Sequence, residues 1–417
     1  MPDTADHIDD LTAFLAASPS SYHAAAGAGR RLEAAGFARL DEMEDWQGAG
    51  RHYVLRDGAV IAWAKPERAT AVSPFRILGA HTDSPGFKLK PRPTIRAHGW
   101  LQAGVEVYGG PLLNSWLDRE LELAGRLVTR DGAEHLVRTG PFLRIPQLAI
   151  HLDRSVNDGL TLDRQRHTTP VFGVGSLGDV LDRLAEAAGL PAAQVAGYDV
   201  LTADTQAPRR FGQGDELLAA GRMDNLSSVH AGLTALLAAP TDGDHVSVLA
   251  AFDHEELGSA SRSGASGPFL ADVLARVSGG TTQELLRAYA GSWCVSADTG
   301  HGVHPNYPER HDPVNAPMLG GGPLLKINAN QRYATDAHGA ALWSRACERA
   351  GVPWQEFVSN NAVPCGSTIG PLTATRLGIR TVDVGIPLLS MHSARELAHV
   401  GDVAALAGAI VAFFAGA

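Results

Sequence analysis

The sequence predicts an α/β core that is interrupted by a second, β-rich domain. In the outer parts of the chain, short apolar runs of strand length alternate with helical segments, as expected for strands buried on both faces. Between about Pro91 and Thr205, short alternating runs with frequent Pro and Gly are typical of a β-rich domain. We assign residues 1–90 and 207–417 to a discontinuous core domain and residues 91–206 to the inserted domain. The length of 417 residues fits two or three domains.

Two helices are expected at the start of the chain. Pro19 separates an Ala-rich helix, from about Ser20 to Ala35, from a first helix marked by Ile8, Leu11, Phe14 and Leu15. Two β-like runs follow, Tyr53 to Ala64 and Phe75 to Ala80. The second run ends abruptly before a polar segment, which places His81 at the end of a strand.

In the inserted domain, the predicted elements are strands at Gly104 to Tyr108 and Leu121 to Val128 and a helix near Asp179 to Ala188. After it, an apolar helix begins at Asp224 and ends near Ala238. Three further runs read as buried strands of the core: Val246 to Phe252, Trp293 to Ser296 and Arg380 to Gly385. The apolar tail from Ala404 to Ala417 is predicted to form a buried last helix.

Charge and cysteine content narrow the function classes. The 35 basic and 45 acidic side chains give a formal net charge of −10, which disfavours nucleic acid and anionic membranes as partners. The three cysteines are too few and too dispersed for a disulfide framework or a thiolate metal site. The acidic segment Met1 to Asp10 has no signal-peptide pattern, and the tail 404–417 is too short to span a bilayer. We expect a cytoplasmic protein.

Acidic and His residues follow several of the predicted strands or begin the helix after a strand. They are His81 with Asp83, Asp224, Glu255 with Glu256, Asp298 and His392. In an open α/β sheet, ligands bind outside the carboxyl ends of the strands, so these residues can converge in one crevice. Carboxylates and imidazoles without Cys suit catalytic Zn²⁺ or a similar divalent ion. An Asp at a helix start, such as Asp224, can supply the carboxylate shared by a pair of ions.

Each of these residues also has an ordinary structural interpretation. Asp224 can serve as a helix N-cap, the adjacent Glu255 and Glu256 can form a solvated turn, and a His at a strand end is often structural. The combination favours function, because two carboxylates directly after a buried strand are costly unless cations compensate them. Successive residues point in different directions, so one Glu can bind a metal while the other faces the substrate water.

Five segments in this order resemble the signature blocks of the M18 aspartyl aminopeptidases: His81–Pro85, Gly221–Asn225, Asp253–Gly258, Ser296–Tyr307 and Met391–Glu396. The resemblance covers nearly the whole chain. It implies a zinc-aminopeptidase-like core with a mixed β-sheet flanked by helices, plus an inserted β-rich dimerisation domain. The implied activity is removal of N-terminal Asp or Glu from peptides.

The resemblance also implies two Zn²⁺ per subunit, with Mn²⁺ or Co²⁺ as alternative ions. By this comparison His81 and Asp298 hold one ion, Glu256 and His392 hold the other, and Asp224 bridges them. Glu255 is then the general base, and Asp83 orients the His81 imidazole. In the wider family of co-catalytic metallopeptidases a cis peptide follows the bridging Asp, so we expect a cis bond between Asp224 and Asn225.

Substrate preference is approached through the lysines. Lys65, Lys88, Lys90 and Lys326 are the four lysines among 35 basic residues, so a Lys departs from the habit of this Arg-rich chain. Lys326 lies in a β-like apolar run, where a surface role and a functional role are about equally plausible. An acidic substrate needs a local cation in an acidic protein. The family comparison places Lys326, with His304 and Tyr333, around an N-terminal Asp or Glu side chain.

The segment Ala149–Leu152 of the inserted domain resembles a family block whose His reaches the active site of a neighbouring subunit. His151 is the matching residue, and an ordinary His at the edge of the core is the interpretation favoured without the resemblance. Members of the family form dodecamers with tetrahedral symmetry, built from dimers through the inserted domain. The resemblance therefore implies a homododecamer.

Three alternatives remain open from the sequence. Gly173 to Gly178 with Asp199 about twenty residues later resembles a dinucleotide fingerprint, which suggests an NAD-binding oxidoreductase, although the preceding run contains Pro170. A noncatalytic assembly protein with this fold would have no need of Glu255. A related dizinc aminopeptidase or amidohydrolase with another side-chain preference is the nearest rival.

Overall fold

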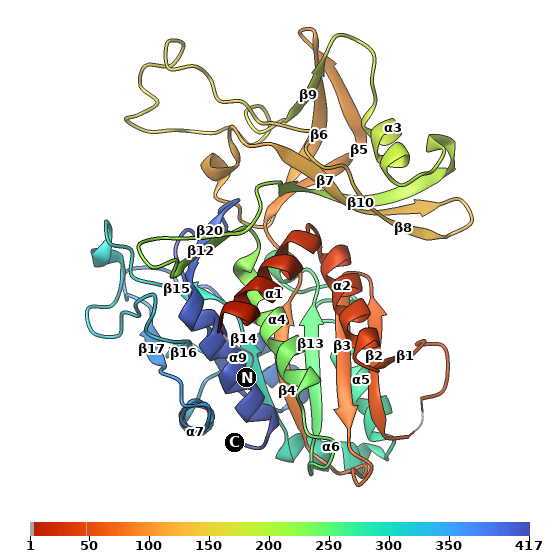
Figure 1. The fold of residues 1–417 in the computed structure, drawn as a ribbon, viewed down its shortest axis with the longest axis vertical. Coiled ribbons are helices and arrows are strands. Elements are labelled where there is room, and N and C mark those ends of the chain that lie inside the picture. Colours follow the sequence, from red (N-terminus) through yellow and green to blue (C-terminus); the bar gives the residue numbers. More distant parts are fainter. Residues whose placement is uncertain (1–3, 47) are drawn as a thin grey trace.

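The computed structural model describes residues 4–46 and 48–417 of the chain. A large sheet with helices on both faces forms the lower part of the molecule in Figure 1, and a smaller sheet lies above it. Both termini of the drawn chain lie in the lower part. The two sheets meet at the end of the large sheet where its central strands finish, and this junction positions the site described below.

The large sheet is mixed, which confirms the predicted α/β core. The strand order is β1 (Ala38–Arg39), β2 (Gly50–Arg56), β3 (Ala59–Lys65), β13 (Val246–Phe252), β4 (Phe75–His81), β14 (Trp293–Ala297), β18 (Arg380–Gly385), β16 (Leu324–Ile327) and β17 (Gln355–Val358). The central strands β13, β4, β14 and β18 are parallel to one another, whereas β3 and β16 flank them in antiparallel pairings.

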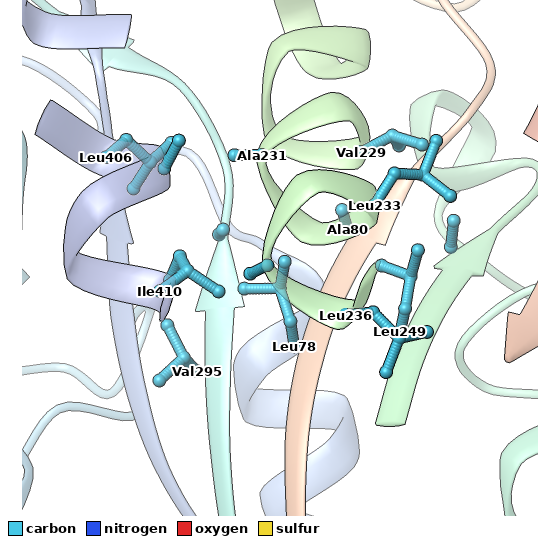
Figure 2. Packing of buried hydrophobic residues seen from close by; sticks show 14 of the residues in the cluster. Leu78, Ala80, Val229, Ala231, Leu233, Leu236, Leu249, Val295, Leu406 and Ile410 are labelled. Atoms are coloured by element: carbon cyan, nitrogen blue, oxygen red, sulfur yellow. The ribbon is translucent and has the colours of Figure 1, made fainter. Parts of the chain in front are cut away.

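Helices bury both faces of the large sheet, so its central strands are apolar at successive positions. Two clusters of buried apolar residues lie between the sheet and its helices, one on each face of the sheet. Leu78 of β4 packs in the first cluster, and its neighbour Ile77 packs in the second. Figure 2 shows the first cluster, where Leu233 and Ile410 come from two different helices. The helices of this face are α1 (Thr4–Ala17), α2 (Ser21–Ala34), α4 (Met223–Leu237), α7 (Ala337–Ala350) and α9 (Val400–Phe414). Those of the other face are α5 (Phe269–Ser278), α6 (Thr282–Gly291) and α8 (Ile369–Leu377).

The structure divides one expected β-like run into two strands. The apolar run from Tyr53 to Ala64 reads as continuous, but a turn at Asp57 and Gly58 separates β2 from β3, which pair as an antiparallel hairpin. Asp57 has φ of +55°, a conformation that Asp tolerates better than most residues. The Asp-Gly pair is a recognised hairpin signal, so the sequence contained the information needed for this turn.

The second sheet is antiparallel throughout and packs against the short helix α3 (Val180–Ala187). Asp179 caps this helix by accepting a hydrogen bond from the Leu181 amide. Its strands are, in order, β8 (Glu134–Arg138), β7 (Leu121–Thr129), β10 (Val195–Asp204), β5 (Gly86–Ala97), β6 (Trp100–Tyr108) and β9 (Val171–Val174).

The dinucleotide interpretation is wrong for this fold. The strand before the glycine-rich segment is β9, an antiparallel edge strand, and not the central parallel strand that the fingerprint requires. Asp199, the acidic residue of that fingerprint, forms ion pairs with Lys88 and Arg126. Two small sheets complete the fold: β11 (Arg209–Phe211) with β12 (Leu217–Ala220) and β20 (Glu396–His399), and β15 (Gly300–His301) with β19 (Pro387–Leu388).

No helix in residues 4–46 and 48–417 combines the length and apolar character needed to cross a bilayer. The last helix, α9, is strongly apolar because it packs between α4 and α7 on the large sheet. This confirms the expectation of a buried last helix.

Candidate metal centre

The acidic and His residues singled out in the sequence lie together at the carboxyl ends of the parallel strands. His81 is the last residue of β4, and Asp298 directly follows β14. Glu255 and Glu256 lie in a single 3₁₀ turn three residues after β13. His392 lies in the loop between β19 and β20. Because β4, β13 and β14 are parallel neighbours, their ends bring these side chains to one edge of the sheet.

Asp224 reaches the same place from the start of α4. The first residues of this helix are irregular, because Asp224 and Asn225 have non-helical backbone angles and the peptide bond between them is cis. The expected cis bond is therefore confirmed. The N-cap residue is Arg222, so Asp224 does not cap the helix. Its carboxylate instead faces the imidazoles of His81 and His392.

The two oxygens of Asp224 face different imidazoles. Oδ1 lies 3.3 Å from His81 Nε2, and Oδ2 lies 3.4 Å from His392 Nε2. Asp298 Oδ1 is 3.5 Å from the same His81 nitrogen, and Glu256 Oε1 is 3.4 Å from the same His392 nitrogen. Ligand atoms about 2.0 to 2.1 Å from a tetrahedral ion are about 3.3 to 3.4 Å apart. Each imidazole therefore forms, with two carboxylate oxygens, a set with the spacing of zinc ligands.

Two buried oxygens fit the presence of cations. No hydrogen bond from the described residues reaches Asp224 Oδ1 or Glu256 Oε1 with acceptable geometry. A buried carboxylate oxygen without a partner is costly unless a positive charge compensates it. Burial and the nearby Asp224 carboxylate also raise the pKa of Glu256 well above its ordinary value. The donor set, two imidazoles and three carboxylates without Cys, suits Zn²⁺.

Asp83 supports His81 from behind, as expected from its position two residues later. The His81 Nδ1 atom lies 3.0 Å from the Asp83 carbonyl oxygen and 3.4 Å from Asp83 Oδ1. Burial raises the pKa of Asp83, but hydrogen bonds and the His81 charge more than offset this and lower it overall. A proton on Nδ1 leaves the Nε2 lone pair directed at Asp224 and Asp298.

Glu255 lines the cavity next to the metal-binding set. This cavity has a volume of about 240 Å³ and is also lined by Lys326, Tyr333 and Thr299. The Glu255 amide donates a 3.0 Å hydrogen bond to Asp83 Oδ1, which fixes the turn. Burial, reinforced by the neighbouring carboxylates of Asp298 and Asp83, raises the pKa of Glu255 to about 7. A carboxylate that lines this cavity can accept a proton from a water molecule bound there and return it.

Lys326 and Tyr333 lie in the same cavity, whereas His304 does not line it. Lys326 is 1% exposed, donates to the Thr299 carbonyl oxygen at 2.6 Å and lies 5.3 Å from the centre of the Tyr333 ring. His304 lines a neighbouring cavity of about 320 Å³. Tyr333 and Met391 line both cavities, so they separate the cavity of His304 from the one that contains the candidate metal ligands.

His151 is not in the site of its own chain. It lies in an exposed turn of the long connection between β8 and β9, two strands of the second sheet. It does not line the 240 Å³ cavity. Leu148, Ile150 and Leu152, which flank it, are also exposed.

Two residues that support the site, Glu396 and Tyr108, were not predicted from the sequence. Glu396 is buried and accepts hydrogen bonds from the Asp224 and His392 amides, both at 3.0 Å. Burial and the Asp224 charge raise the pKa of Glu396 to about 8. Tyr108 donates to Asp83 Oδ2 from the second sheet. Glu396 is the last residue of the segment Met391–Glu396, whose resemblance to a family block could have indicated it. Tyr108 lies at the end of an alternating strand, and this pattern does not indicate a site residue.

Comparison with known proteins identifies the family. The family model described as Aminopeptidase I zinc metalloprotease (M18) matches residues 14–414. The chain is a member of the M18 family. A protein of Streptomyces avermitilis named Probable M18 family aminopeptidase 2 is 57% identical over 98% of this chain and 98% of its own. Its namesake in Mycobacterium leprae is 45% identical over 97% of each chain.

Solved structures agree with this M18 assignment. The structure of an Ape4 and Nbr1 complex matches with a TM-score of 0.95 and 34% identity, over 99% of this chain and 86% of that one. The structure of the S. cerevisiae mApe1 dodecamer matches with a TM-score of 0.86 and 29% identity, over 98% and 96%. The M18 protein is thus a zinc metallo-aminopeptidase, which supports the enzyme reading of the sequence.

Proposed function

We propose that the protein removes N-terminal Asp and Glu residues from peptides at a centre of two divalent ions. His81 and Asp298 hold one ion, Glu256 and His392 hold the other, and Asp224 bridges them. The observation that supports this most strongly is that the two oxygens of Asp224 face the two imidazoles at 3.3 and 3.4 Å. When bound, the two metal ions polarise the scissile carbonyl and lower the pKa of a water molecule.

Glu255 is the general base in this proposal. Its carboxylate takes a proton from the attacking water while the water oxygen adds to the carbonyl carbon. The same group then returns the proton to the leaving amine as the C–N bond breaks, so one residue acts first as base and then as acid. Glu256, adjacent in sequence, faces His392 instead and serves as a ligand.

Lys326 supplies the positive charge for an acidic side chain. Its ammonium has three N–H donors and one is directed at the Thr299 carbonyl oxygen. The nearest carboxylate contact is Asp298 Oδ2 at 3.9 Å, which leaves room for a closer anion from the substrate. Tyr333 forms the wall beside the ammonium, and His304 acts from the adjoining cavity.

Assembly is the second part of the proposal. Residues 91–206 form a dimerisation domain, and dimers build a homododecamer in which His151 enters a neighbouring active site. The exposed apolar side chains beside His151, Leu148, Ile150 and Leu152, support an interface there. The S. cerevisiae mApe1 structure, which is named as a dodecamer, matches 98% of this chain at 29% identity.

Metal removal is the first test. We expect the purified protein to contain two Zn²⁺ per chain and to lose its hydrolysis of an N-terminal Asp substrate after exhaustive chelation, with recovery when Zn²⁺ is restored. Elemental analysis and a chromogenic Asp substrate measure both quantities. Full activity in metal-free protein would rule out the proposed chemistry, and one ion per chain would rule out the paired centre.

Substitution of Lys326 by Met tests the substrate preference. This change keeps the aliphatic stem and removes the charge, so kcat/KM for Asp and Glu substrates should fall at least tenfold more than for Ala or Leu substrates. Lys65→Met is a matched control, because Lys65 also donates to a backbone carbonyl, that of Val277, but away from the site. Equal losses on acidic and neutral substrates would favour an M18 aminopeptidase of different preference.

A further inference from the structure

A short segment of the second sheet reaches the metal-binding set. The segment Tyr108–Gly110 begins at the last residue of β6. The Tyr108 hydroxyl donates to Asp83 Oδ2 at 2.9 Å, and the Gly110 carbonyl oxygen lies 3.0 Å from His392 Nδ1. Between them, Gly109 has φ of +66° and lies so close to Glu256 that a Cβ would be 3.1 Å from that residue's Cβ.

These contacts act on both imidazoles. A neutral imidazole carries one proton, and an acceptor at one nitrogen places the proton there and leaves the other nitrogen free to bind a metal. For His392 the acceptor at Nδ1 is the Gly110 carbonyl oxygen itself. For His81 the acceptors are the carbonyl and carboxylate oxygens of Asp83. In both cases Nε2 then faces the shared carboxylate of Asp224.

Tyr108 fixes the orientation of the Asp83 carboxylate. Oδ1 accepts from the Glu255 amide at 3.0 Å and faces His81, while Oδ2 accepts from the Glu256 amide at 3.2 Å and from the Tyr108 hydroxyl. The hydroxyl bond is the shorter of the two at Oδ2. Asp83 is 3% exposed and Tyr108 7%, so bulk water has little access to replace a lost hydroxyl.

We infer that Tyr108 is a positioning residue for the metal centre, and that the segment Tyr108–Gly110 makes this centre depend on both sheets. Tyr108 acts through Asp83 on His81, whereas Gly109 and Gly110 act on Glu256 and His392. The inference rests on the proposed function, in which two divalent metal ions bind at this centre. It predicts that the two metal positions respond separately to changes in this segment.

Tyr108→Phe tests this directly, because it removes one oxygen and keeps the ring. We expect the affinity of the His81 and Asp298 position for Zn²⁺ to fall about 10- to 100-fold, as when other supporting groups behind a ligating His are lost. The affinity of the Glu256 and His392 position should stay within about threefold. Competition titrations with a chromophoric chelator measure both affinities without any substrate, and thermal melting of the metal-free protein reports the fold separately.

Tyr198→Phe is the matched control. Tyr198 belongs to the same sheet, and its hydroxyl donates to the Lys90 carbonyl oxygen at 2.6 Å rather than to the site. Gly109→Ala is the second variant, and it should weaken the Glu256 and His392 position because the added methyl group meets Glu256. It decides the inference by itself if Tyr108→Phe does not fold.

The possible outcomes separate this inference from the proposed function. A wild-type protein that binds no Zn²⁺ would overturn the proposed function. If the wild type binds two ions and Tyr108→Phe binds both as tightly, the inference alone is wrong. It is also wrong if Tyr198→Phe lowers the affinity as much, because a general loosening of the sheet would then be the cause, or if Gly109→Ala leaves both positions unchanged.

Discussion

Glu255→Gln is expected to lower kcat on an Asp substrate by about 10² to 10⁴, with both metal ions retained. The amide has nearly the shape of the carboxylate but cannot take a proton from water. The turn that holds residue 255 depends on its backbone amide, which donates to Asp83, so the substitution leaves this contact in place. Steady-state kinetics and elemental analysis of the same preparation measure the two effects.

Glu256→Gln is the matched comparison, because it makes the same chemical change one residue later. Glu256 Oε1 faces His392 Nε2, so we expect this variant to lose metal first and activity as a consequence. Added Zn²⁺ should restore part of its activity, whereas Glu255→Gln should show no recovery. The opposite pattern would mean that the roles of the two glutamates are exchanged.

His151→Ala is expected to lower kcat by about 10² to 10³ in the assembled protein. If His151 enters a neighbouring site, it can donate a hydrogen bond to the oxygen that becomes negative in the tetrahedral intermediate, and loss of such a donor has an effect of this size. His135→Ala is a suitable control, because His135 lies on β8, the edge strand of the second sheet that precedes the loop holding His151. The control should keep nearly full activity.

Mixing two inactive variants tests whether the site is shared. When His151→Ala subunits exchange with Glu255→Gln subunits, some sites receive an intact Glu255 from one chain and an intact His151 from another, so activity should return. A lack of rescue despite proven exchange, or a fully active monomer, would contradict a shared site.

Much of the core was predictable because burial leaves a periodic record in the chain. The strands Val246–Phe252 and Arg380–Gly385 were expected with the bounds that the structure shows. Helices cover both faces of Val246–Phe252, so every position of that strand is apolar or small. The hairpin at Asp57 was not predicted, although its Asp-Gly pair signals a turn, because the apolar runs on either side together have the length of one long strand.

The clustering of the candidate metal ligands was predictable for a related reason. A polar or charged residue at the end of a buried strand, such as His81, or directly after one, such as Asp298, contrasts with the run before it, and parallel strands bring such ends to one edge. Glu396 had no such contrast, because its carboxylate bonds to backbone amides of residues 224 and 392, which are close only in the folded chain.

The amino-acid sequence alone thus indicated most strands and helices and the types of residue available to bind metal, because these depend on residues within a few positions of one another. The tertiary structure determined that the two oxygens of Asp224 face different imidazoles, and the packing of the two sheets brought Tyr108 to Asp83. Packing also put Lys326 and Tyr333 in the cavity and His304 in the next one. The contacts of Asp224 with His81 and His392, and of Tyr108 with Asp83, join residues 25 to 168 positions apart. Their geometry depends on strand order and register, which no local pattern of side chains records.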